Sequence, residues 1–336
     1  MAILKSTSPK RILLLALISS CCMLQSCMAI PTEADLKPNN NMRLVTFFAW
    51  ADQKDLNKID WSHFTDAVYE YVDVDPEDGT LVYSWPDNAL SDFVNKTKSH
   101  DVHPWIAVVG KWPNSTFFPT IESSSRQLFI KNLIDFCNSY GLYGVNLDIE
   151  PISDAATFSD FIVELATSFE NSNLKLSIAV ESKNLNVLPY AAAYLDWIDV
   201  MAYDIYYTVG YPEHSTYEDS IQAIDLYFQG GIPKNKLLLG IPFYGRDAAT
   251  GFFRYDYIAN KYAPSPGANS VSEPSVPGGI IWFNGSDLVR QKTKYVIEHG
   301  YLGVAVYKAP LNIENGKSLL NSITEQLLTG TTRQGS

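Results

Sequence analysis

Apolar and polar positions divide the chain into short strand-like segments and longer helix-like segments that alternate. Eight short stretches rich in apolar residues have the length and composition of strands: 44–48, 67–72, 105–110, 145–150, 174–180, 197–203, 236–243 and 302–307. Between them, amphipathic spacing predicts helices at 89–97, 123–140, 158–169, 217–228, 287–299 and 317–328. This alternation predicts parallel strands joined by helical crossovers.

Eight strand–helix units fit an α/β fold, a closed (β/α)8 TIM barrel, which usually has about 250 residues plus insertions. An open, doubly wound sheet is the alternative, but no glycine-rich nucleotide loop follows the first strand. Residues 247–280 are rich in Pro, Gly and Ser and are expected to form a short, loop-like insertion before the last βα unit. We therefore predict a single barrel domain over residues 42–330.

Residues 1–27 have the pattern of an export signal, in which basic residues precede an apolar run at 12–18 that is too short to span a bilayer. The following segment, ending Leu-Gln-Ser-Cys at Cys27, resembles a bacterial lipoprotein signal, so we expect lipidation of Cys27. Cleavage of an ordinary signal near Cys27 or Ala29 is the alternative. Residues 28–41 are polar and predict a flexible tether. The protein is thus expected to be exported, either as a cell-envelope lipoprotein or in secreted form.

Charge and composition exclude several classes of function. The formal net charge is −12, and without residues 1–26 it would be −15, from 22 basic and 37 acidic residues. An acidic surface disfavours nucleic acid and other polyanions as ligands.

Five scattered His and no Cys cluster predict no metal site, and we expect no cofactor and a monomer. The many aromatics, 20 Tyr, 16 Phe and 7 Trp, can fill a core or line a groove for sugar rings. Cys137 is expected to be a small buried hydrophobe.

Polar side chains share one face of the strand within GLYGVNLDIEP, residues 141–151. Alternation places Asn146, Asp148 and Glu150 on that face. Pro151 ends the strand, so that in a barrel Glu150 lies at the active-site rim and the other two lie deeper. Buried polar groups are costly unless they bind one another or a ligand. A structural polar cluster is the alternative, but two acids at the end of a buried strand indicate a catalytic site.

Two stacked carboxyl groups indicate glycoside chemistry, with Glu150 as general acid, its pKa raised by the neighbouring anion. Because Asp148 and Glu150 are two residues apart on one strand, they lie on the same side of the scissile bond. They cannot easily flank the sugar as a pair of acid and nucleophile. A group of the substrate must then be the nucleophile, and an N-acetyl carbonyl at C2 can serve.

The sequence of this strand resembles the D-G-x-D-x-D-x-E signature of glycoside hydrolase family 18, the chitinase-like barrels. The signature positions are filled in order by Tyr143, Gly144, Asn146, Asp148 and Glu150. Three more segments resemble family motifs in the same order along the chain: VVGKW at 108–112, MAYD at 201–204 and GIPFYGR at 240–246. The resemblance covers roughly residues 43–310 and implies a TIM-barrel glycosidase.

The resemblance also implies roles for individual residues. Glu150 protonates the glycosidic oxygen and then activates water, and Asp148 holds the acetamido N–H and stabilises an oxazolinium-like intermediate. Tyr203 donates to the acetamido carbonyl. Asn146 supports Asp148 as a member of the catalytic set. The resemblance and the strand ends suggest these substrate contacts: Asp204, Met201, Tyr244, Arg246, Tyr307, Trp112 and Phe47.

The chain departs from the family pattern at several positions. Asn146 replaces an acid, and the loss of a like charge should lower the pKa of Asp148. Tyr143 replaces the first Asp of the signature. Tyr307 stands where chitinases of the family usually have the Trp beneath the reacting sugar. The insertion at 247–280 is expected to be too short for the α+β module that deepens the groove in many relatives, which favours short oligosaccharides or glycan ends.

The resemblance leaves the substrate open. The MAYD and FYGR segments favour hydrolysis of β-1,4 bonds beside N-acetylglucosamine in chitin or chito-oligosaccharides. An endo-β-N-acetylglucosaminidase acting on N-glycans and a catalytically inactive sugar-binding barrel are the alternatives within the family. An unrelated barrel hydrolase, which would not need an N-acetyl group, is a further alternative.

Overall fold

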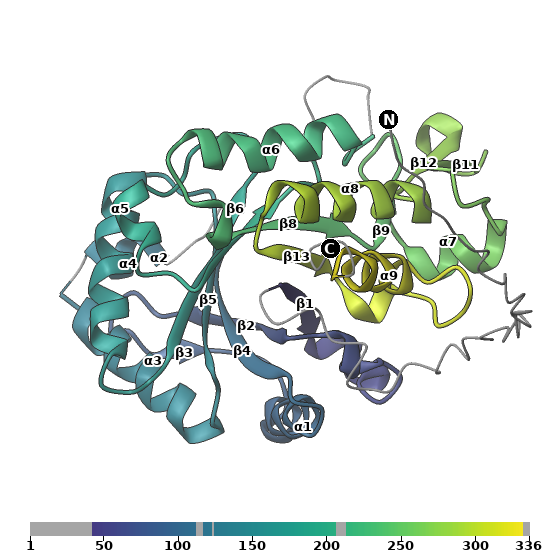
Figure 1. Cartoon of the computed structure of the whole chain (residues 1–336). Coiled ribbons are helices and arrows are strands. Elements are labelled where there is room, and N and C mark those ends of the chain that lie inside the picture. The colour runs from purple at the N-terminus through teal and green to yellow at the C-terminus, as the bar shows by residue number, and fades with distance from the viewer. Residues whose placement is uncertain (1–41, 112–116, 123, 206–212, 332–336) are drawn as a thin grey trace, which may run out of the picture. The chain divides into compact units, whose positions relative to one another are not determined.

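Eight parallel strands form a closed barrel in the computed structural model, which describes residues 42–111, 117–122, 124–205 and 213–331 (Figure 1). The barrel strands are β1 (Arg43–Ala49), β2 (Asp66–Val74), β4 (His103–Lys111), β5 (Gly144–Glu150), β6 (Lys175–Glu181), β7 (Trp197–Met201), β8 (Leu237–Pro242) and β13 (Gly303–Tyr307). The predicted export signal with Cys27, the predicted tether and Trp112 lie outside the described residues.

The strand order shows how the barrel closes. It runs β1-β13-β8-β7-β6-β5-β4-β2, and β1 also pairs with β2, all in parallel. The short β3 (Leu81–Val82) adds an antiparallel pairing to the end of β2. The predicted (β/α)8 barrel is therefore confirmed, and the open sheet is excluded.

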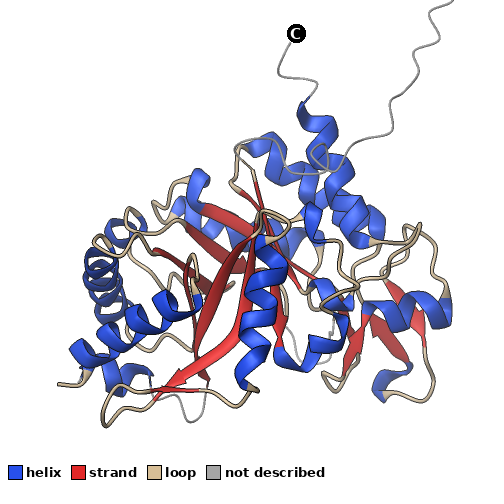
Figure 2. Cartoon of the chain, turned by 90° about the horizontal axis from the view of Figure 1, so that it is seen from below, coloured by secondary structure: helices blue, strands red, loops and turns tan. Residues whose placement is uncertain are grey.

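Helices surround the barrel (Figure 2). The six predicted helices are present and differ from the prediction by no more than three residues at either end: α1 (Asp87–Lys98), α3 (Arg126–Tyr140), α4 (Ala155–Phe169), α6 (Tyr217–Gln229), α8 (Ser286–His299) and α9 (Leu319–Thr331). Three shorter α-helices of the described residues were not predicted: α2 (Phe117–Glu122), α5 (Pro189–Ala192) and α7 (Tyr255–Tyr262). No helix of the described residues is long and apolar enough to cross a membrane.

Capping residues fix where several helices begin and end. Asp154 accepts hydrogen bonds from two backbone N–H groups at the start of α4, and Thr216 accepts one at the start of α6. Each cap of this kind adds about 1 kcal/mol to the stability of the folded protein. Gly141 ends α3 in the left-handed conformation with φ 65°, as expected for a C-cap glycine.

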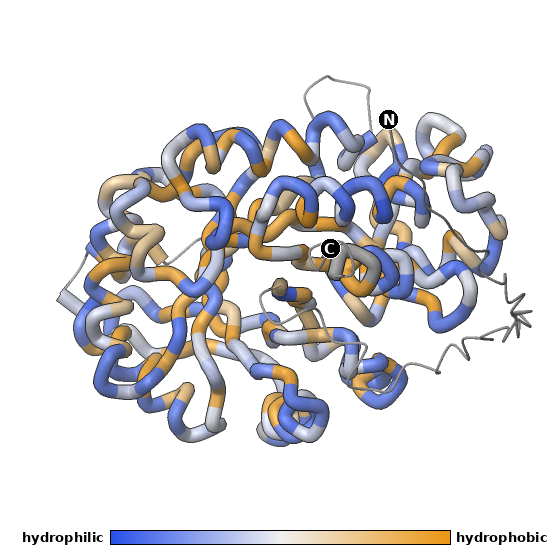
Figure 3. Tube along the Cα trace, viewed as in Figure 1, coloured by the Kyte–Doolittle hydropathy of each residue, from blue (hydrophilic) through white to orange (hydrophobic). Residues whose placement is uncertain are grey.

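The core has two parts, one between barrel and helices and one inside the barrel. Val145, Leu147 and Ile149 of β5 belong to the outer part, so the other face of β5 points inward, as predicted. Cys137 is buried in the outer part. The inner part is made largely of Val45, Phe47, Val68, Trp105, Ala107, Val109, Trp197, Leu238 and Ala305. Hydrophobic segments follow the barrel strands, whereas helices alternate hydrophobic and hydrophilic residues (Figure 3).

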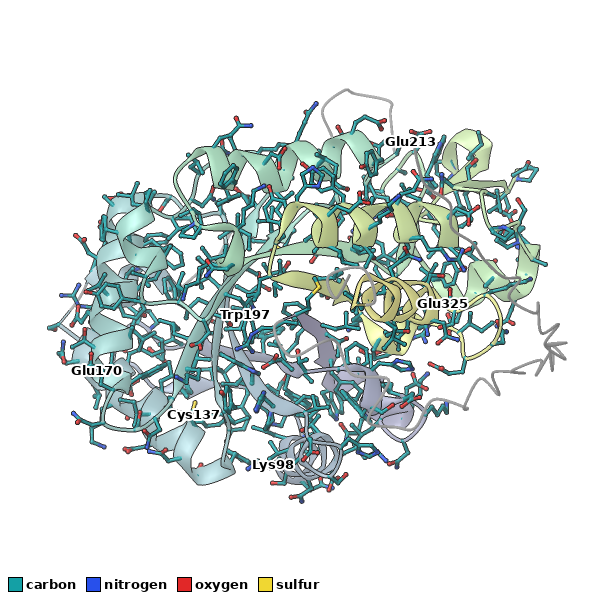
Figure 4. All side chains as sticks on the ribbon, in the orientation of Figure 1. Lys98, Cys137, Glu170, Trp197, Glu213 and Glu325 are labelled. Carbon is teal, nitrogen blue, oxygen red and sulfur yellow. The ribbon has the colours of Figure 1, made fainter. Side chains whose placement is uncertain are left out.

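Two tryptophans fill the barrel at the starts of their strands. The rings of Trp105 and Trp197 lie 4.1 Å apart, and Trp197 is seen among the barrel strands in Figure 4. Tyr143 packs here too, stacked on His103 at 4.0 Å and 5.4 Å from Trp105. Where the family signature has its first Asp, this chain therefore has an aromatic residue that packs at the barrel floor.

The insertion before the last helix–strand unit is not the loop that the sequence predicts. It contains β10 (Phe252–Arg254), α7 (Tyr255–Tyr262) and β11 (Ser270–Ser272), and it joins β9 (Tyr244–Arg246) and β12 (Ile280–Trp282) in a four-stranded antiparallel sheet. The small sheet lies to one side of the barrel (Figure 2). Strands of three residues are too short for alternation to reveal, and the expectation that no α+β module is present was wrong.

Candidate active site

A pocket of about 480 Å³ opens where the barrel strands end. Glu150, Met201 and Tyr307 line it and are each the last residue of a barrel strand. Nine of the residues singled out from the sequence line this pocket: Phe47, Asp148, Glu150, Met201, Tyr203, Asp204, Tyr244, Arg246 and Tyr307. Segments far apart in the sequence thus converge on one cavity.

The polar face of β5 descends from the pocket rim into the barrel. Glu150 is half-buried at the rim, Asp148 is 9% exposed and Asn146 is fully buried. Asn146 does not line the pocket, and its Nδ2 donates to Oγ of Ser177 on β6 over 2.9 Å. Asn146 is therefore anchored sideways, to the neighbouring strand, beneath the two acids.

Tyr203 lies just after β7, deep in the pocket. Burial, followed by the charge of Asp199, raises the pKa of Tyr203 well above its ordinary value, so its hydroxyl keeps its proton at any physiological pH. Gly240 of β8 makes room for the ring, since a Cβ there would lie 3.0 Å from a Tyr203 ring carbon and 2.7 Å from the Val200 carbonyl oxygen. A neutral hydrogen-bond donor is thus held beside Asp148.

Asp204 is the centre of a hydrogen-bonded network at one wall. It accepts from the Tyr244 hydroxyl at 2.9 Å and from Nε and Nη2 of Arg246 at 2.9 and 2.6 Å, and His214 Nδ1 lies 3.1 Å away. Burial alone would raise the pKa of Asp204, but the hydrogen bonds from His214 and Arg246 outweigh it and hold the pKa below its ordinary value. These bonds also hold Asp204 in the left-handed conformation, with φ 54°.

Aromatic rings form the base of the pocket around Tyr307. The ring of Tyr307 lies 5.9 Å from Phe47 and 6.1 Å from both Tyr203 and Tyr244. Burial, and then the charge of Glu70, raises the pKa of Tyr307. Aromatic surfaces of this kind stack on the apolar faces of sugar rings.

Several lining residues were missed from the sequence, chiefly Glu70 of β2, Glu181 of β6 and Phe252 of β10. Glu70 is 8% exposed and lies 3.4 Å from Lys308 Nζ, which also pairs with Asp52 at 2.7 Å. Alternation could have found Glu70, since Val68 two residues earlier faces the barrel interior. No comparable pattern marks Phe252, because its strand belongs to the insertion that was predicted as a loop.

A second hollow adjoins the first and has a similar volume, about 480 Å³. Glu70 and Tyr307 line both, so the two are parts of one groove. The second hollow presents the exposed side chains of Trp50, Tyr71 and Tyr83. The groove therefore extends beyond the first pocket and carries aromatic surface at its far end.

The described residues contain no group of three or more His, Cys, Asp or Glu that could hold a metal ion. The chemistry available in the pocket is that of carboxyl groups, tyrosine hydroxyls, one arginine and the polar side chains of Ser182, Lys183 and Asn184. Such a set can donate and accept protons and can hold a neutral, hydroxyl-rich ligand.

Comparisons with known proteins agree with this architecture. The family model described as glycosyl hydrolases family 18 matches residues 43–311. Chitinase 1 of Aphanocladium album is 31% identical over 171 residues, which are 41% of this chain and 40% of that protein. A class V chitinase of Arabidopsis thaliana is 24% identical over 339 residues, covering 84% of this chain and 89% of that protein.

Solved structures share the fold. A class V chitinase from Nicotiana tobaccum, in complex with NAG4, has a TM-score of 0.74 at 22% identity, over 85% of this chain and 99% of that one. A chitinase-like agglutinin from Robinia pseudoacacia has a TM-score of 0.69 at 20% identity, over 84% of this chain and 99% of that one. At these identities the likeness establishes the fold alone.

Proposed function

The chain belongs to glycosyl hydrolase family 18, and we propose that it hydrolyses β-1,4 bonds beside N-acetylglucosamine in chitin or chito-oligosaccharides. The observation that carries the proposal is the placement of Glu150 at the rim and Asp148 below it, both lining one pocket with Tyr203. An acid, a deeper carboxyl group and a neutral donor are the groups that substrate-assisted cleavage requires.

The proposed reaction begins with proton transfer from Glu150 to the glycosidic oxygen. As the bond from C1 to that oxygen breaks, the acetamido carbonyl oxygen of the same sugar bonds to C1 and forms an oxazolinium ring. Asp148 accepts the acetamido N–H, and Tyr203 donates to the carbonyl oxygen and aims it at C1. Water then attacks C1 while Glu150 takes its proton, which reopens the ring and gives a product with retained configuration.

The rest of the pocket is proposed to bind the sugar. Tyr307 offers a flat face beneath the reacting ring, with Phe47 beside it. Arg246 and Tyr244 are held by Asp204 at the wall, where they can meet hydroxyl or acetamido oxygens. The aromatic second hollow supports a substrate of several sugars rather than a glycan end alone.

Product analysis by mass spectrometry tests the proposal. Purified residues 28–336 would receive a chito-oligosaccharide ladder together with a high-mannose glycopeptide. We expect shortened chito-oligomers, absent with Glu150→Gln. Release of a glycan that leaves one N-acetylglucosamine on the peptide would instead identify an endo-β-N-acetylglucosaminidase.

A sugar-binding role without catalysis is the second candidate, because a chitinase-like agglutinin shares the fold and this chain departs from the family signature at Tyr143 and Asn146. Binding of chito-oligosaccharides measured by calorimetry, with no product from the wild-type protein between pH 4 and 8, would favour this role. The presence of both Asp148 and Glu150 argues for the enzyme.

A further inference from the structure

Lys292 of α8 is fully buried, which is unusual for a long cationic side chain. It lies on the interior face of the helix, where its neighbours at helical spacing include the apolar residues Leu288, Val289 and Val296. Taking an ammonium group out of water destabilises a fold unless nearby groups accept its hydrogen bonds. An apolar side chain would fill this position more simply, so the charge calls for a reason beyond packing.

Each N–H bond of the Lys292 ammonium group meets an oxygen atom. Nζ lies 2.9 Å from the carbonyl oxygen of Ser215, 2.8 Å from Oγ of Ser215 and 2.6 Å from Oδ1 of Asn284. Nδ2 of Asn284 donates to the same Ser215 carbonyl at 2.9 Å, which turns Oδ1 toward the lysine. Burial lowers the pKa of Lys292, but a neutral amine has only two N–H bonds and would leave one of these oxygens without a donor. The three contacts therefore match the ammonium form.

Ser215 links Lys292 to the segment that follows β7. An ammonium group only donates, so the Ser215 hydroxyl accepts from Lys292 and directs its own proton to the carbonyl oxygen of Ala202, at 2.6 Å. Oγ of Ser220 lies 3.5 Å from the same oxygen, too far for a strong hydrogen bond. Ala202 is fully buried and immediately precedes Tyr203, which lines the pocket. The serine hydroxyl, oriented by the lysine, thus fixes the peptide group that leads into Tyr203.

The residue before Ser215 contacts the pocket wall. His214 is buried, and its carbonyl oxygen accepts from the N–H of Ile205 at 3.0 Å. Its Nδ1 lies 3.1 Å from Oδ1 of Asp204, the centre of the network at the wall. The segment after β7 is thus held at three points by two consecutive residues, of which Ser215 is fixed by the ammonium group.

Lys292 is absent from the described residues that line the pocket, so it acts at a distance from any substrate. We infer that Lys292 is a positioning residue, whose buried ammonium group orients the Ser215 hydroxyl and thereby fixes the Ala202 carbonyl and the place of Tyr203 in the pocket. The alternative is a lysine that only stabilises the packing of α8. The inference rests on the proposed function, since it is in that reaction that Tyr203 must meet the acetamido carbonyl.

Lys292→Met separates positioning from packing. Methionine keeps the length of the side chain but has no N–H, so the Ser215 hydroxyl loses the donor that orients it. We expect kcat to fall by about tenfold or more, because Tyr203 is no longer held in place. KM should change little, because Asp204 keeps its bonds from the arginine and the tyrosine at the wall. Steady-state kinetics on a fluorogenic chito-oligosaccharide measure both.

Thr293→Val is the matched control. Thr293 is the next residue of α8, is also fully buried, and its hydroxyl donates to the carbonyl oxygen of Val289 within the helix at 2.9 Å. The substitution removes a buried polar group from the same helix and leaves Ser215 alone, so kcat should stay at the wild-type value even where the melting temperature falls. Wild-type kcat in a folded Lys292→Met, or equal losses of kcat in both variants, would overturn the inference.

Ser215→Ala tests the link itself, and it decides the question if Lys292→Met does not fold. It removes the hydroxyl that joins the ammonium group to the Ala202 carbonyl, so kcat should fall here too, and a wild-type kcat would overturn the inference. Where all variants fold, the double variant should lose less in kcat than the product of the two single losses, since both act on the same carbonyl. Losses that multiply would show two independent effects and would contradict the link.

A crystal structure of Lys292→Met shows the position of Tyr203 without turnover. We expect the Ser215 hydroxyl to have left the Ala202 carbonyl and the Tyr203 ring to be displaced. Both groups in their wild-type places would overturn the inference, whether or not the protein is active. Wild-type protein that cleaves no chito-oligosaccharide contradicts the proposed function instead, and the hold on Tyr203 is then still measured by the structure.

Discussion

Asn146 shows how a single residue in the candidate site departs from its family while leaving the arrangement intact. Its amide is buried beneath Asp148 and donates to Ser177 of the next strand, so the position still bears a hydrogen-bonding group. What it lacks is a charge. The electrostatic cost of ionising Asp148 is therefore lower than it would be above a second carboxylate.

Replacing Asn146 by the Asp of the family signature should change how kcat/KM depends on pH. In Asn146→Asp, a like charge beneath Asp148 raises the pKa of Asp148, so the acidic limb of kcat/KM moves up by on the order of one pH unit. The measurement is kcat/KM on a fluorogenic chito-oligosaccharide from pH 3 to 7, with Asn146→Gln to separate size from charge. An acidic limb that coincides with that of wild type would contradict this.

At the scale of elements, β8 supports the site through a residue without a side chain. A Cβ atom at Gly240 would lie 2.7 Å from the carbonyl oxygen of Val200 and 3.0 Å from a ring carbon of Tyr203. The strand thus lets Tyr203 pack closely across β7 and β8. The same strand ends at Pro242, shortly before Tyr244 and Arg246 enter the Asp204 network.

We predict that Gly240→Ala weakens catalysis more than it weakens folding. The added methyl group must displace the Tyr203 ring or the β7 backbone, which costs about 1–3 kcal/mol of stability. Because Tyr203 would move, kcat should fall by about tenfold or more while KM changes little. Steady-state kinetics beside thermal melting check this, and Ala179→Gly on β6, two strands away from β8, serves as a control for altered side-chain volume. Wild-type kcat in Gly240→Ala would show that Tyr203 need not be held there.

The sequence was most informative for elements with a strong period. The alternation of β5 correctly predicted which face points inward, and six helices were found close to their expected bounds. The small sheet of the insertion was missed because its strands pair over only a few residues and carry no clear period. Glu70 lies in a predicted strand, but its importance depends on which neighbours the closed barrel brings to it.

At the scale of the whole molecule, a partly buried ion pair joins strands of the barrel at the end opposite the pocket. Asp66 of β2 is fully buried, accepts from Arg43 of β1 at 2.8 Å and from Trp105 of β4 at 2.9 Å, and lies 3.4 Å from His103. One carboxylate thus links three neighbouring strands, β1, β2 and β4. Burial opposes its ionisation, but the bonds from His103 and Arg43 hold the pKa of Asp66 below its ordinary value.

Asp66→Asn should destabilise the barrel by about 3 kcal/mol or more at pH 7, because it leaves Arg43 without its buried partner. The pKa of Asp66 is lower in the folded protein than in the unfolded chain, where it is near 3.9. The ion pair therefore stabilises the fold fully above about pH 4, and this stabilisation is lost as pH falls through the folded-state pKa. Urea unfolding at pH 7 and pH 3 measures the free energy of unfolding of both proteins. The difference between wild type and Asp66→Asn should be smaller at pH 3. Asp135→Asn on α3, whose side chain is 61% exposed, is the control. An equal difference in unfolding free energy at both pH values would contradict a stabilising role for ionised Asp66.

The central claim is that this barrel cleaves beside N-acetylglucosamine with Glu150 as the acid and the substrate's own acetamido group as the nucleophile. Proton NMR during cleavage of N-acetylchitotetraose tests it most directly, because it records both turnover and the configuration of the first product. The account predicts that the β-anomer forms first and that Glu150→Gln gives no product. Initial formation of the α-anomer, or cleavage by Glu150→Gln at the wild-type rate, would contradict it.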